Sequence, residues 1–135
     1  MASILDPRGE QQWEEVRAFL GSVFADQPRA GYLLAIIDDV LAIGADEVLA
    51  VATSMHDLVI APKPMGDPRV DVVVVRAPSS LAPAAEQDLV RIDHLSASGR
   101  STSIERPRAD AVALFWRFMR EEFGIQRSEV GGTAD

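Results

Sequence analysis

Residues 107–124, PRADAVALFWRFMREEFG, contain the pattern that decides the fold. At the roughly 100° turn per residue of an α-helix, six apolar side chains share one broad face, while Arg117, Arg120 and Glu121 occupy the other. The six are Val112, Phe115, Trp116, Phe118, Met119 and Phe123. A helix of this kind, after a series of strand-like segments, is typical of one that packs on a β-sheet. We therefore predict an α+β fold that this helix closes.

The length and composition limit the architecture to one domain. A chain of 135 residues, 47% of them hydrophobic, can bury roughly two thirds of the surface that its unfolded form exposes. The chain contains no cysteine, which excludes disulfides, thiolate nucleophiles and thiolate metal ligands. We expect a single domain over residues 1–124, followed by a flexible tail over residues 125–135.

The charge is acidic and unevenly distributed. The formal net charge is −8, and residues 1–60 hold ten acidic but only three basic side chains. An acidic protein repels phosphate backbones at long range, so nucleic acid is not an expected partner. No membrane contact is expected, because residues 31–45 are interrupted by Asp38 and Asp39 and a span needs about 20 apolar residues. The N-terminus lacks the pattern of a secretory signal, so we expect a cytoplasmic protein. The high ratio of arginine to lysine is common in bacteria with GC-rich genomes.

Two helices are expected before the strands. The first covers residues 10–25, where Trp13, Val16, Phe19, Leu20, Val23 and Phe24 share one face. The second covers residues 29–43 and ends at Gly44. Its apolar residues cover about 200° of the helical wheel, so it is either the central helix of the monomer or contacts a second copy of the chain. In the second case the candidate interface residues are Leu33, Leu34, Ile37 and Leu41.

Five strands connected as a meander, mainly antiparallel, are expected next. They cover residues 47–53, 58–61, 70–76, 89–96 and 101–106. The four consecutive valines at 72–75 indicate a strand buried on both faces. For the last hairpin we predict a type II′ turn with Gly99 at its positive-φ position. That turn pairs Leu95 with Ile104, Asp93 with Arg106 and His94 with Glu105, three favourable cross-strand pairs.

Few groups of side chains suggest chemistry. In the predicted register His94 and Glu105 are either a general base with its orienting carboxylate or an ordinary cross-strand pair. The arginines around the last hairpin either bind a carboxylate or phosphate, or pair with local acids. The candidate binding residues are Arg91, His94, Glu105 and Arg106. We predict no metal site, because the histidine–aspartate neighbours at residues 56–57 and 93–94 point to opposite faces, and no cofactor, because glycine-rich phosphate loops are missing from the sequence.

Two classes of function are left open. The leading prediction is a non-catalytic protein–protein interaction or regulatory module, of adaptor, chaperone or immunity type, in a bacterial cytoplasm. Its partner is another protein, and self-association as a homodimer follows if the second helix lies at an interface. The alternative is a small ligand-binding or hydrolytic pocket protein that uses His94. Catalysis is less favoured because the sequence offers no obvious nucleophile near His94, and we predict no catalytic residue.

Overall fold

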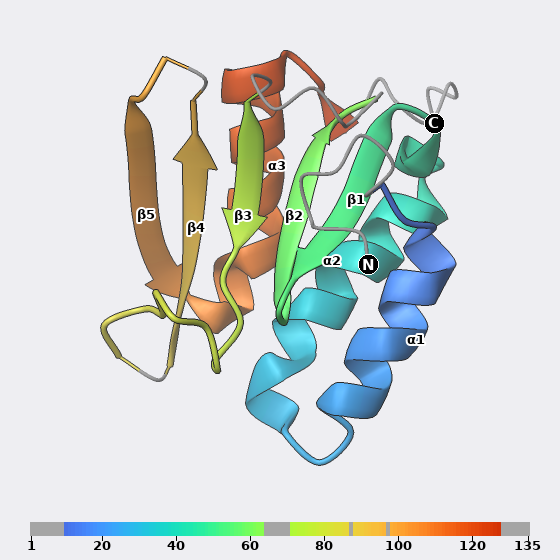
Figure 1. Ribbon diagram of the computed structural model, residues 1–135, viewed down its shortest axis with the longest axis vertical. Helices are drawn as coiled ribbons and strands as arrows, with labels where there is room; N and C mark the ends of the chain where they lie inside the picture. Colours follow the sequence, from blue (N-terminus) through green and yellow to red (C-terminus); the bar gives the residue numbers. More distant parts are fainter. Residues whose placement is uncertain (1–9, 64–70, 87, 97, 128–135) are drawn as a thin grey trace.

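The computed structural model describes residues 10–63, 71–86, 88–96 and 98–127 (Figure 1). Its helices are α1 (Trp13–Val23), α2 (Gly31–Ala42) and α3 (Ala111–Phe123). Its strands are β1 (Leu49–Ser54), β2 (Asp57–Pro62), β3 (Val72–Val75), β4 (Leu89–Leu95) and β5 (Ser101–Pro107). Short 3-10 segments, η1 (Pro28–Ala30), η2 (Ala45–Glu47) and η3 (Arg108–Asp110), precede α2, β1 and α3. The strands pair antiparallel in the order β1–β2–β3–β4–β5, which confirms the predicted α+β meander.

The helices all pack on one face of the sheet and share one core. In the view of Figure 1, α2 and α3 run behind the strands and α1 is seen to the right of β1. Alternate strand residues point to that side, as the two-residue period of a strand requires. The main core therefore joins these strand residues to the helices, and it includes Leu49, Val51, Leu58, Ile60, Val73, Val75, Val90 and Ile92. A second, smaller apolar cluster lies on the opposite face and consists of Ala50, Ala52, Val59, Ala61, Val72 and Val74. The valine run of β3 is thus buried on both faces, as predicted.

The predicted closing helix forms and packs as expected. Phe115 and Met119 are fully buried, and burying a side chain of this size stabilises the fold by about 1.5–3 kcal/mol. The rings of Phe115 and Trp116 meet edge to face with their centroids 5.1 Å apart. Gly124 ends the helix with a φ of 70°, a conformation that glycine adopts at low cost.

Helix α2 lies between the other two helices, which explains its wide apolar surface. Asp38 accepts hydrogen bonds from Arg17 of α1, and Asp39 accepts one of 2.7 Å from the indole N–H of Trp116 in α3. Leu33 and Ile37 have 0% of their surface exposed. Both therefore belong to the core of the chain itself, and the prediction of an interface role for them is corrected. The other two candidates, Leu34 and Leu41, are half-buried and pack against the same core.

Helix α1 begins later than predicted, at Trp13 instead of residue 10. The preceding Gln11 pairs with the edge strand β1, because its N–H donates to the Val51 carbonyl (2.7 Å) and its side-chain oxygen accepts from the Thr53 N–H (2.9 Å). These bonds satisfy edge groups of the sheet that a helical turn would leave open. The indole of Trp13 then donates to the Leu49 carbonyl at 2.9 Å and fixes α1 on the sheet.

The predicted register of the β4–β5 hairpin is wrong by three residues. Ile92 pairs with Ile104, and Leu95 pairs with Ser101. The turn is longer than expected, because the Ser96 N–H bonds the Arg100 carbonyl and Gly99, with a φ of 91°, lies in a three-residue loop. An odd shift moves every side chain of β5 to the other face relative to β4. The observed register places both isoleucines on the helix side, where apolar burial outweighs the cross-strand pairs predicted at the surface.

The end of the chain divides at residue 127. Residues 128–135 of the predicted tail lie outside the described residues. Before them, Ile125 packs against the core and the Arg127 guanidinium pairs with Asp39 at 2.8 Å. No helix in the described part of the chain is both long and apolar enough to cross a membrane.

Candidate functional site

The open face of the sheet, on the side away from the helices, carries a network of ion pairs. Arg76, which follows β3, contacts Asp57 of β2 through Nη1 (3.1 Å) and Asp93 of β4 through Nε (2.8 Å). Arg91 binds the other oxygen of Asp93 through Nε at 2.9 Å. Both aspartates are buried. A buried carboxylate stays charged only if positively charged partners bind it, so these arginines are held in place by the aspartates. The network therefore ties β2, β3 and β4 together.

The network is held in its charged form. Burial alone would raise the pKa of Asp93, but hydrogen bonds from Arg91, Ser103 and Arg76 outweigh that effect and lower it. Burial also disfavours the charged Arg76 guanidinium, yet Asp93 and Asp57 raise its pKa overall. Both shifts keep Asp93 and Arg76 charged near neutral pH, so this pair is better suited to positioning than to proton transfer.

Asp57 also anchors the loop that follows β3. One oxygen accepts the backbone N–H of Ala77 at 2.8 Å, and the other accepts the hydroxyl of Ser80 at 2.7 Å. Beside it, the His56 ring lies 3.3 Å from the Ser79 hydroxyl through Nδ1. Residues 77–82 are therefore fixed to the turn between β1 and β2.

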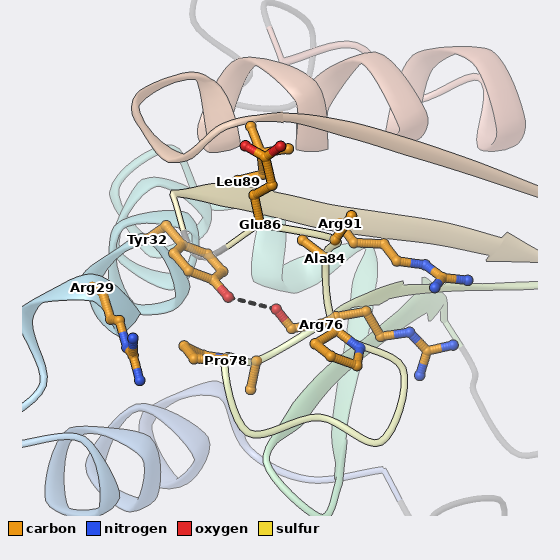
Figure 2. A pocket seen from close by; sticks show the side chains of 11 residues that line it. Arg29, Tyr32, Arg76, Pro78, Ala84, Glu86, Leu89 and Arg91 are labelled. Carbon is orange, nitrogen blue, oxygen red and sulfur yellow. Dashed lines mark hydrogen bonds between the residues drawn. The ribbon is translucent and has the colours of Figure 1, made fainter.

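A pocket of about 160 Å³ lies between this loop and the start of α2 (Figure 2). Its lining consists of Arg29, Tyr32, Arg76, Ala77, Pro78, Pro83, Ala84, Ala85, Glu86, Leu89 and Arg91. Figure 2 shows Arg76 and Arg91 extending side by side away from Tyr32, so their guanidinium groups belong to the network rather than to the pocket centre. The Tyr32 hydroxyl donates to the Arg76 carbonyl at 2.6 Å. Burial first, and then the charge of Asp57, raise the pKa of Tyr32, which keeps this hydroxyl protonated.

The turn between β1 and β2 exposes apolar side chains beside the loop. Met55 is 71% exposed, and Leu81 in the loop is 88% exposed. His56 lies between two phenylalanines, with ring centroids 5.8 Å from Phe19 and 5.6 Å from Phe24. Phe19 was predicted on the buried face of its helix, but it lies at the margin of that face and remains 42% exposed. We call Phe19, Met55, His56 and Leu81 the tip surface.

Met55 adopts an unusual backbone conformation. Its φ is 58°, and it is the one residue other than glycine with a positive φ among those the structure describes. His56, the second residue of the two-residue turn, does not share this conformation, which is the pattern of a type II′ turn. Glycine is the usual residue at the first position of such a turn, because side chains with a Cβ are strained there.

The four candidate binding residues do not form one site. Arg91 and Glu105 are cross-strand partners on the open face. His94 and Arg106 point to the helix side, where Arg106 is exposed and donates to the Glu105 carbonyl. The predicted pairing of His94 with Glu105 is therefore wrong, for the reason given for the hairpin register.

His94 instead links three parts of the fold. Its Nδ1 lies 3.2 Å from a Glu122 oxygen in α3, and its Nε2 lies 3.4 Å from an oxygen of Asp71, just before β3. Its ring also meets Phe123 edge to face. Among the described residues, no hydroxyl group is hydrogen-bonded to His94. Both ring nitrogens lie beside carboxylates of other elements, which favours a structural role for His94.

Metal binding and similarity to known proteins give no further assignment. Within residues 10–63, 71–86, 88–96 and 98–127, no three His, Cys, Asp or Glu side chains are grouped so as to hold a metal ion. No protein-family model, curated protein or solved structure matches the chain. The case for a function therefore depends on the geometry alone.

Sequence reasoning missed the tip surface and the pocket. A signal for the first was present, because a two-residue turn between strands at residues 54–57 places Met55 where glycine is preferred. The pocket had no comparable signal. Tyr32 and Arg91 are 59 residues apart in the sequence. Both line the pocket only because the end of β3, one end of β4 and the start of α2 lie at the same side of the molecule.

Proposed function

We propose that this protein is a non-catalytic interaction module that binds another protein through the tip surface. The observation that carries the proposal is Met55, which combines a positive φ with an exposed apolar side chain. Each feature lowers the stability or solubility of the free protein, and glycine at the same position would avoid both. Strained residues often occur where a side chain serves binding rather than folding.

The surroundings of Met55 support a preorganised docking surface. Asp57 and Ser79 hold the loop of Leu81 against the turn, and Phe19 and Phe24 enclose His56. A surface fixed in this way loses little conformational entropy on binding. Methionine and aromatic side chains are also enriched in protein interfaces. The expected partner is therefore a protein that offers apolar side chains, in line with an adaptor, chaperone or immunity type of module in a bacterial cytoplasm.

A pocket protein that uses His94 has less support. His94 is not among the residues that line the 160 Å³ pocket, and its ring nitrogens face Glu122 and Asp71. A homodimer formed through α2 also has less support, because two of its four candidate interface residues, Leu33 and Ile37, are fully buried in the monomer. The tip surface is the better-founded candidate.

Quantitative affinity capture from a bacterial lysate with the wild-type chain and three variants tests the proposal. Met55→Ser and Leu81→Ser remove apolar surface from the tip. Leu95→Ser is the matched control, because Leu95 is also exposed (40%) but lies at the opposite end of the sheet, beside the β4–β5 turn. We expect at least one protein to be captured by the wild type and by Leu95→Ser and lost with both tip variants. Capture of the same proteins by all four chains would refute the role of the tip surface.

A further inference from the structure

A second feature, independent of the tip surface, is a groove between the segments that precede α2 and α3. Its lining comes from the two sides in turn: Pro28, Arg29, Gly31, Tyr32 and Ala35 from the first, and Arg108, Ala109, Ala111 and Val112 from the second. The groove continues past Asp26 and Gln27, again between Arg29 and Arg108. Two arginines from segments almost 80 positions apart in the sequence thus face one space.

Neither arginine is neutralised in the part of the chain that the structure describes. Arg29 and Arg108 form no ion pair there, whereas Arg17, Arg76, Arg91 and Arg127 each bind an aspartate. The Nε atom of Arg108 is buried and has no hydrogen-bond partner. Both positive charges reach the Tyr32 hydroxyl, since each acts to lower its pKa against the larger effect of burial. A buried guanidinium N–H without an acceptor is costly, so the Arg108 guanidinium lacks an acceptor that would stabilise it.

The backbone adds positive potential at the same place. The groove reaches Gly31 and Ala111, the first residues of α2 and α3, and neither helix has a side-chain cap at its N-terminus. The N–H groups of Gly31 and Ala111 bond to the carbonyls of Pro28 and Arg108 in the preceding 3-10 turns. What the helix starts add is therefore the positive end of each helix dipole, equivalent to about half a charge. The nearby acids are Asp26 at the outer margin of the groove, Asp110 in η3, and Glu86 in the adjoining pocket that Arg29 also lines. All three side chains are exposed.

We propose that this groove binds a phosphate group between Arg29 and Arg108. A phosphate monoester carries a charge of about −1.5 to −2 at pH 7, which matches two guanidinium groups and two helix starts better than a single carboxylate does. Its oxygens accept several hydrogen bonds, and guanidinium groups bind such oxygens with good geometry. The phosphate comes either as the free ion or as part of a small ester. In the second case the adjoining 160 Å³ pocket, which shares Arg29 and Tyr32, has the size of a cavity that holds a benzene ring.

The test is a titration of the full chain with inorganic phosphate and with phenyl phosphate at constant ionic strength. Binding is followed by the melting temperature and by the NMR signal of the Arg108 Nε–H group. We expect both phosphates to raise the melting temperature and to shift that signal, and acetate at equal concentration to do neither. Tighter binding of phenyl phosphate than of inorganic phosphate would identify an ester with an apolar body, and equal binding would identify the free ion.

Three variants complete the experiment. Arg29→Gln and Arg108→Gln should each weaken phosphate binding by about tenfold or more, since a hydrogen bond to a charged group contributes roughly that much. Arg100→Gln is the control, because Arg100 is exposed in the β4–β5 turn at the other end of the sheet. Arg29 is itself exposed, so its substitution tests the site even if Arg108→Gln fails to fold. An unchanged response of Arg29→Gln to phosphate, or an equal response of the wild type to acetate, would overturn the proposal.

Discussion

Replacing Met55 with glycine should make the protein more stable and less able to bind its partner. A side chain at a left-handed position costs roughly 1–2 kcal/mol relative to the right-handed conformation. Glycine avoids that cost but loses about 0.5–1 kcal/mol more backbone entropy on folding. Because Met55 is 71% exposed, little packing is lost with its side chain. The expected net gain is about 0.5–1 kcal/mol in the free energy of unfolding, or roughly 2–4 °C in melting temperature for a chain of this size.

The molecule offers an internal standard for this magnitude at Gly44. Its φ is 77°, and a Cβ added there would meet no atom within 4 Å. Gly44→Ala therefore measures the conformational cost alone, and it should lower the free energy of unfolding by about the amount that Met55→Gly raises it. Met55→Ala separates the two roles of the residue, since it keeps the strained Cβ and removes the rest of the side chain. We expect Met55→Ala to match the wild type in stability and to share the binding defect of Met55→Gly.

Urea unfolding and calorimetry of the four proteins decide the matter. Should Met55→Gly prove no more stable than the wild type while Gly44→Ala loses stability, the backbone at Met55 is not strained and the main argument for its role in binding fails.

Three further predictions concern the ion pairs and α2. Burial alone would raise the pKa of Asp93, but hydrogen bonds from Arg91, Ser103 and Arg76 lower it overall. The charged Asp93 carboxylate therefore stabilises the fold above about pH 4, and this stabilisation is lost as the pH falls through the native pKa. Asp93→Asn should therefore cost about 3 kcal/mol at pH 7 and flatten the loss of stability between pH 5 and pH 2, as measured by urea unfolding; a wild-type slope in the variant would contradict this. Asp39→Ala removes the hydrogen-bond acceptor of the Trp116 indole, a side chain that is 8% exposed. The substitution should lower the free energy of unfolding by about 1–3 kcal/mol, as followed by tryptophan fluorescence. Asp39→Asn can still accept this hydrogen bond and should lower it less. Leu33→Glu should unfold the chain because Leu33 is fully buried, whereas Leu34→Glu should remain folded, as measured by circular dichroism. If Leu33→Glu instead stays folded and has a smaller mass than the wild type by light scattering, Leu33 lies at an interface between two copies of the chain.

The sequence predicted the fold correctly where the burial of apolar side chains was the dominant effect. The aromatic face of α3 and the valines of β3 leave no arrangement other than burial, and both lie as expected. The strand order agrees with the general tendency of consecutive strands to pair, and short turns join β1 to β2 and β4 to β5.

Where effects of similar size competed, the prediction failed. The register of β4 and β5 was chosen from cross-strand pairs worth up to roughly 1 kcal/mol each, such as Asp93 with Arg106. Asp93 instead binds Arg76, which directly follows the neighbouring strand β3 and helps to fix Asp93 on the open face. Of the candidate site, Arg91 was found, but Tyr32 and Arg29 come from a distant helix start and had no pattern to mark them.

The sequential order of the strands has a consequence for how the protein folds during synthesis. Each strand pairs with the one made just before it, so β1 to β4 can form a growing sheet while the rest of the chain is still inside the ribosome. Helix α3 is made after all five strands and packs in the same core as Ile92. A nascent chain that stops before residue 111 would expose this part of the core and would be a natural target for chaperones that bind unfinished proteins.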